Sequence, residues 1–382
     1  MHANQYLTLA DQLYHHLIDE ADLPTSVALL PSLNQSLLEE LATEAEKAAK
    51  QHPRQGWTIT KVANAAAFQQ KADLFLQSLS AWYLGRAANA WVHPLLVSQA
   101  IHQARAGFLK LNKPAWVAAC DWQLNELSWT KTDQTKSAKV LKKALQILES
   151  SNLRNFSPYC RLALASNQLF LNQVEETWNN LKICETAFLV NHDLFGQAQC
   201  SLTAANYLRQ QSRFVQSSNS LESALKIFLG ENNIPCIGRT IYQQGLISLF
   251  STTDIAKTVS LFEQADGYFL DSEVDLWHGI CQSYLGMAIL QDGQLERAEQ
   301  SFEEAKKVFH RHHNLSQLAD AYTASGLLNL AKGNSQASID QFKKAKRLYL
   351  QVGRVVSVGV DSSNLGKAYR SSGRYQDALS QQ

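Results

Sequence analysis

The chain has no long hydrophobic run, little glycine and proline, and no excess of charge of either sign. None of its segments approaches the roughly 20 uninterrupted apolar residues of a membrane helix, and residues 1–11 lack the basic and apolar parts of a secretory signal. We therefore expect a cytoplasmic protein with no membrane partner. With 17 Gly and 7 Pro in 382 residues, a disordered or turn-rich all-β chain is excluded. The balance of 35 Lys and Arg against 34 Asp and Glu argues against a nucleic-acid partner.

What the sequence has is an internal repeat of about 40 residues. Three similar copies near the C-terminus carry a central glycine at Gly286, Gly326 and Gly366. Toward the N-terminus the same register falls at intervals of 40, and once of 41, on Gly245, Ala205, Ala165, Asn125 and Gly85. We call these eight positions the repeat centres.

Three columns of apolar residues follow the centres at constant offsets of 16, 19 and 23 residues. In one copy they are Phe302, Ala305 and Phe309, and six other copies carry similar residues, with one shifted by a single position. Offsets that differ by three and then four residues mark one stripe of a helix. Gly293, Gly333 and Gly373 stand seven residues past a centre, where a glycine can end a helix in the left-handed conformation. Each repeat is therefore predicted to be a first helix, a turn and a second helix.

The pairs Leu285-Gly286 and Leu365-Gly366, with the spacing from Gly293 to Ala298, resemble the tetratricopeptide repeat family. The likeness is to its longer, roughly 40-residue form, of the MalT-like and CHAT-associated type, and it covers about residues 40–382. It implies an all-α, right-handed superhelical solenoid whose first helices line a concave surface.

Two domains are expected, an N-terminal helical cap over residues 1–35 and a solenoid over 36–382. The solenoid would hold eight to nine helix pairs, and the last pair is incomplete because its second helix should run to about residue 390. Residues 37–57 also resemble the N-terminal portion of bacterial tetratricopeptide proteins that carry a caspase-like CHAT peptidase downstream. We therefore expect the chain to be a fragment of a longer protein.

The residues that could carry chemistry have simpler explanations. Cys120, Cys160, Cys200 and Cys281 each stand five residues before a centre, in a column of mostly small residues that predicts packing. The histidines of residues 310–313 are predicted to lie at a helix end, where they favour the helix dipole, rather than to bind a metal. The sequence contains no catalytic-nucleophile motif, no dinucleotide-binding motif and no phosphate-binding loop. We expect no catalytic residue, no metal and no cofactor.

Five of the eight tryptophans fall within about 50 residues, at Trp82, Trp91, Trp116, Trp122 and Trp129. Two interpretations remain open at this point. They fill the core between first helices, or they anchor a partner, since tryptophan dominates interface energetics.

Positions −6, −2, +1 and +5 from each centre share one face of the first helix by the 3.6-residue period. They predict a partner-binding concave face formed by Tyr83, Arg86, Gln123, Glu126, Tyr159, Thr203, Asn206, Arg239, Gln243, Tyr284, Asn364 and Lys367. The family's carboxylate clamp has Lys at −3 and Asn at +1. Because Leu202 stands at −3 before Asn206, an acidic C-terminus is not the expected ligand.

The sequence therefore predicts a non-catalytic scaffold that binds a protein or peptide along this face. The alternative is a regulatory arm of a longer enzyme, such as a caspase-like CHAT peptidase whose catalytic domain lies beyond Gln382.

Overall fold

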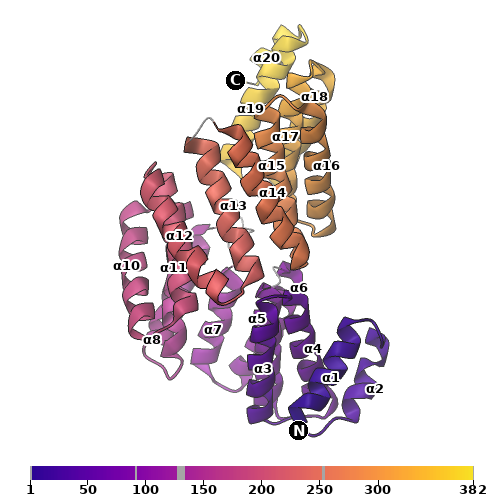
Figure 1. The fold of residues 1–382 in the computed structure, drawn as a ribbon, viewed down its shortest axis with the longest axis vertical. Coiled ribbons are helices and arrows are strands. Elements are labelled where there is room, and N and C mark those ends of the chain that lie inside the picture. The colour runs from indigo at the N-terminus through magenta and orange to yellow at the C-terminus, as the bar shows by residue number, and fades with distance from the viewer. Residues whose placement is uncertain (1, 91–92, 127–133, 252–253, 382) are drawn as a thin grey trace. The chain divides into compact units, whose positions relative to one another are not determined.

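The computed structural model describes residues 2–90, 93–126, 134–251 and 254–381. Its regular elements there are twenty α-helices and two short 3₁₀ helices, so the all-α prediction is confirmed (Figure 1). None of the described helices is long and apolar enough to cross a membrane.

Eighteen of the helices form consecutive pairs, in which an odd-numbered first helix is followed by an even-numbered second helix. The pairs are α3 (Gln35–Ala49) with α4 (Pro53–Gln69), α5 (Leu74–Ala90) with α6 (Pro94–Lys110), α7 (Pro114–Glu126) with α8 (Gln134–Glu149), α9 (Ser157–Phe170) with α10 (Val174–Val190) and α11 (Leu194–Gln210) with α12 (Phe214–Gly230). They continue with α13 (Ile234–Ser251) and α14 (Ile255–Asp271), α15 (Asp275–Gln291) and α16 (Leu295–Arg311), α17 (Leu315–Ala331) and α18 (Ser335–Gln351), and α19 (Val355–Ser371) and α20 (Tyr375–Leu379).

Two compact units divide the chain. Unit 1 holds the described residues up to Cys236 together with 271–274, and unit 2 holds 237–270 and those from 275 onward.

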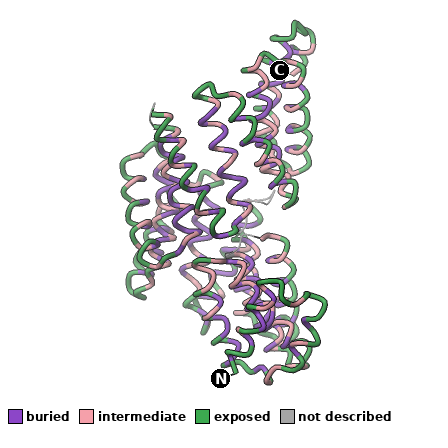
Figure 2. Tube along the Cα trace, turned by 45° about the vertical axis from the view of Figure 1, so that its right-hand side comes forward, coloured by how far each residue is buried: buried purple, intermediate pink, exposed green. Residues whose placement is uncertain are grey.

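The second-helix columns found in the sequence form the core of seven of the nine pairs, from α5–α6 to α17–α18. All 21 side chains at offsets 16, 19 and 23 are at most 3% exposed, and the buried residues follow the facing sides of the helices (Figure 2). At the glycine centres Gly286 and Gly326, the residue at offset 16 occupies the space that a side chain would fill. An added Cβ would lie 2.6 Å from Phe302 at Gly286 and 2.5 Å from Phe342 at Gly326. The turn glycines Gly293, Gly333 and Gly373 have φ values of +74° to +79°, as predicted.

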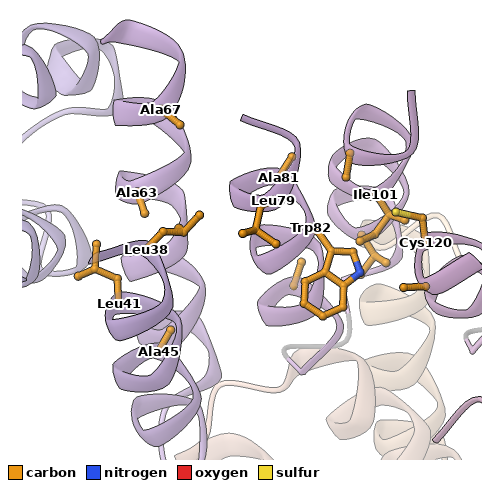
Figure 3. Packing of buried hydrophobic residues seen from close by; sticks show 14 of the residues in the cluster. Leu38, Leu41, Ala45, Ala63, Ala67, Leu79, Ala81, Trp82, Ile101 and Cys120 are labelled. Carbon is orange, nitrogen blue, oxygen red and sulfur yellow. The ribbon is translucent and has the colours of Figure 1, made fainter. Parts of the chain in front are cut away.

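The N-terminal segment packs on the first helix pair. Helices α1 (His2–Tyr14) and α2 (Leu23–Ala28) contact α4, with a short 3₁₀ helix, η1 (Glu20–Asp22), between them. The Gln70 amide nitrogen lies 3.2–3.3 Å from the carbonyls of Val27, Leu30 and Pro31, and its oxygen accepts from the Leu33 N–H at 2.8 Å. Leu38, Leu41 and Ala63 lie close together where α3 meets α4 (Figure 3).

Candidate functional site

The twelve predicted face residues all lie on first helices. Seven belong to unit 1, on α5, α7, α9 and α11, and five belong to unit 2, on α13, α15 and α19. Gln123, Gln243 and Asn364 are buried, whereas Glu126 and Lys367 are exposed and the other seven are half-buried.

In unit 1, side chains one residue past successive centres meet each other. The Arg86 guanidinium on α5 forms an ion pair of 3.0 Å with Glu46 on α3, which occupies the same register one repeat earlier. The guanidinium carbon also lies 5.0 Å from the ring centre of Trp82 and 5.8 Å from that of Phe156. Glu46 was missed from the sequence, although extending the register by one repeat before Gly85 would have found it.

Two tyrosines flank this ion pair. Burial and the nearby Glu39 raise the pKa of Tyr83. Burial and a hydrogen bond to Asp193 also raise the pKa of Tyr159, whose hydroxyl donates to Asp193 Oδ2 at 2.6 Å. Both phenols therefore stay protonated at neutral pH, and the Tyr159 proton is already donated to Asp193.

The next first helices add uncharged polar groups and one carboxylate. On α7, Gln123 is 2% exposed, and Glu126 accepts a hydrogen bond of 3.0 Å from Asn89 of α5. On α11, Asn206 is half-buried, and the Thr203 hydroxyl donates to its own helix at Gln199 O. The face is thus lined by phenols, amides, hydroxyls and the Glu126 carboxylate around one ion pair.

Unit 1 curves until its first pair meets a later loop. The carbonyl of Lys50, after α3, accepts a 2.7 Å hydrogen bond from the N–H of Ile234, and its ammonium lies 3.1 Å from Glu231 Oε2. Residues 184 positions apart are thereby joined. First helices of neighbouring pairs also contact each other, α3 with α5, α7 with α9 and α9 with α11, which places them on the inside of this curve.

Unit 2 places its five predicted residues among aromatic and acidic groups. Arg239 lies over the ring of Trp277 at 5.2 Å, and the rings of Tyr284 and Tyr242 are 5.6 Å apart. Near Asn364, the fully buried Asp361 accepts hydrogen bonds of 3.0 Å from the Thr323 hydroxyl.

The cysteine column has a packing role. The thiols of Cys160, Cys200 and Cys281 lie 3.7, 3.5 and 3.1 Å from the carbonyls 19 residues earlier, on the preceding second helix. Burial raises the pKa of Cys160 and Cys200 to about 12. These thiols therefore link neighbouring repeats as protonated groups.

The tryptophans and histidines also contribute to packing. Trp82 and Trp122 are 1% and 5% exposed, which favours core filling, while Trp91 and Trp129 lie outside the described residues. His312 lies just past the end of α16, as predicted for a helix-end residue, and its Nε2 lies 2.8 Å from Asp275 Oδ2. In the described part of the chain, no three His, Cys, Asp or Glu side chains gather as metal ligands.

No protein-family model and no curated protein matches the sequence. Among solved structures, a Rap protein complexed with Competence and Sporulation Factor has a TM-score of 0.67 over 91% of this chain and 96% of that one, at 12% identity. A STAND protein with a tetratricopeptide repeat sensor, PH0952 from Pyrococcus horikoshii, gives 0.58 over 96% and 52% at 14% identity. The Rap conjugation gene regulator of plasmid pLS20, solved with the Phr* peptide, gives 0.57 over 84% and 94% at 14% identity.

At these identities the likeness is one of fold. It confirms the predicted tetratricopeptide-type solenoid. The likeness to CHAT-associated proteins stays a prediction.

Proposed function

We propose that this protein is a non-catalytic cytoplasmic scaffold that binds a peptide or an extended protein segment along the inner face of unit 1. The observation that carries the proposal is the row of donors and acceptors on consecutive first helices, which includes the half-buried Tyr83, Arg86, Thr203 and Asn206. An extended peptide exposes backbone N–H and C=O groups, which phenols, amides and hydroxyls can satisfy.

The fold likeness supports this ligand class. The pLS20 regulator was solved with a peptide, and a Rap protein was solved with Competence and Sporulation Factor. The balanced charge of the chain supports the expectation that nucleic acid is not a partner.

Photo-crosslinking from the inner face tests the proposal. A benzophenone amino acid is placed at Thr203 or Asn206 in the full chain, and in the control at Ser223, which is exposed on the second helix α12. After irradiation in cells of the native host, we expect adducts to a peptide or protein from the first two positions. Equal adducts from Ser223, or none from the inner face, would contradict the proposal.

A variant that fills the inner face with a larger side chain provides a second test. Asn206→Arg puts a long side chain into the inner face, whereas Ser223→Arg adds the same chain to the outer surface. Only the first should abolish the adducts formed from Thr203, provided that both variants keep the wild-type helicity by circular dichroism.

The alternative, a regulatory arm of a longer enzyme, shares this binding face. The match to about half of a STAND protein with a tetratricopeptide repeat sensor supports an array of this kind serving inside a larger chain. Reading the gene beyond the codon for Gln382 tests it, because a downstream catalytic domain is required.

A further inference from the structure

Helix α9 begins one turn later than the corresponding helix in the next repeat. Helix α11 begins at Leu194, so the register places the start of α9 at residue 154, but α9 begins at Ser157. The cause is Pro158, since proline is tolerated only in the first turn of a helix and would break one that started at residue 154. Residues Arg154–Phe156 instead form the 3₁₀ helix η3.

This displaced connection borders an open groove in unit 1. The groove has a volume of about 970 Å³ and lies between η3, the start of α9 and the last turns of α10. Its apolar lining comes from Phe156, Pro158, Ile183, Ala187 and Val190. The volume is within the range of ligand-binding clefts, about 300–1,000 Å³.

Two of these apolar side chains are open to solvent. Ile183 is 49% exposed and Val190 is 72% exposed. They lie two turns apart on one face of α10 with Ala187 between them, and together with the half-buried Phe156 they line the apolar floor of the groove.

The charges around the floor are unequal. Glu149 pairs with Arg161, whereas Asp193 keeps its charge while it accepts hydrogen bonds from the Tyr159 hydroxyl and from the Gly196 N–H at 2.8 Å, so one unpaired carboxylate faces two cations.

The two cations on the rim have no carboxylate partner. Arg154 is exposed and has no ion pair among the described residues. Lys182 is exposed as well, and its ammonium lies 5.5 Å from the Trp178 ring without a carboxylate within ion-pair distance in the same part of the chain. A groove with an apolar floor and two uncompensated cations complements an apolar side chain next to a carboxylate.

We infer that this groove, which we call the α9–α10 groove, is a second docking site for an acidic peptide segment. The segment places a Leu, Ile, Val, Phe or Met side chain on Ile183 and Val190 and a nearby Asp or Glu between Arg154 and Lys182. The site is separate from the inner face, which it adjoins at Tyr159.

Selection from a random library gives the test without a known ligand. A phage library of dodecapeptides is panned on the immobilised full chain and depleted on the Val190→Glu variant. Val190→Glu places a carboxylate on the apolar floor and repels the acidic segment, and because Val190 is 72% exposed the variant should fold.

The matched control is Leu229→Glu. Leu229 is 54% exposed near the end of α12, outside the groove, so its substitution carries the same helix-end penalty.

We expect enriched peptides with an apolar residue within two positions of Asp or Glu. Labelled copies of them should bind the wild type in fluorescence polarisation and lose about tenfold or more in affinity with Val190→Glu, which is about 1.4 kcal/mol. Arg154→Glu combined with Lys182→Glu should weaken binding similarly, while Leu229→Glu and the inner-face variant Asn206→Arg should leave it within about twofold. No enrichment, enrichment of basic or neutral peptides, or equal binding to Val190→Glu would overturn the inference.

Discussion

The close packing at the repeat centres predicts that the same substitution, glycine to alanine, changes the stability of the protein differently at two positions. Gly326→Ala and Gly359→Ala both replace a helical glycine, and both should gain about 1 kcal/mol from the better helix propensity of alanine. At Gly359, on α19, nothing lies within 4 Å of the added methyl group. At Gly326, on α17, the methyl carbon would lie 2.5 Å from Phe342 Cε1, about 1 Å inside normal contact.

The Phe342 ring cannot move aside easily, because it is fully buried between two helices. Overpacking of such a site costs about 1–3 kcal/mol. We therefore expect Gly359→Ala to raise the free energy of unfolding by about 1 kcal/mol. The free energy of unfolding of Gly326→Ala should be about 1–3 kcal/mol lower than that of Gly359→Ala.

Urea unfolding followed by circular dichroism measures both variants, and hydrogen exchange of α17 and α18 locates the effect. Because the backbone gain is common to both, their difference isolates the steric cost. If Gly326→Ala were as stable as Gly359→Ala, the close packing of centre and offset-16 residue would be refuted.

Two further predictions concern titratable groups. All six thiols are buried, and the raised pKa values of Cys160 and Cys200, about 12, leave almost no thiolate at pH 8. Ellman's reagent should therefore modify the native chain slowly and all six thiols after unfolding, and rapid modification of two or more native thiols would contradict the packing role. Burial raises the pKa of Asp361 above its ordinary 3.8, to about 6, so the folded state binds the extra proton and stability falls as pH rises from about 4 to 6. Asp361→Asn keeps an acceptor for Thr323 and should be more stable than the wild type at pH 7 by up to about 3 kcal/mol, with no difference at pH 3.5, in thermal unfolding at the two pH values.

Much of the fold could be predicted from spacing alone. A constant offset of 16 residues from a small centre to a large side chain predicts which two residues touch. Gly286 and Phe302 are in contact as this offset predicts. The left-handed glycine at Gly293 follows from its place between the helices. Local rules suffice because each repeat packs mainly on its neighbours.

The inner face was harder to predict because register states which side chains point inward but not how crowded the inside is. Gln123 shares the register of Tyr83 and Thr203, yet it is 2% exposed while they are half-buried. Crowding depends on where each first helix begins. Pro158 displaces the start of α9, and the ring centre of Phe156, just before this start, lies 5.3 Å from that of Trp82.

Curvature is the property least accessible to sequence, because it accumulates from small rotations at every helix pair. The contact of Lys50 with Glu231 and Ile234 exists only because those rotations sum, across several pairs of unit 1, to bring two loops together. No local motif near either loop signals it. An ion pair on an exposed rim contributes little by itself, but the backbone hydrogen bond beside it fixes the two loops at one separation. That separation sets the space inside the curve. It follows that side chains outside the predicted set, such as Pro158 at the start of α9, help to determine which of the predicted inner-face residues a ligand can reach.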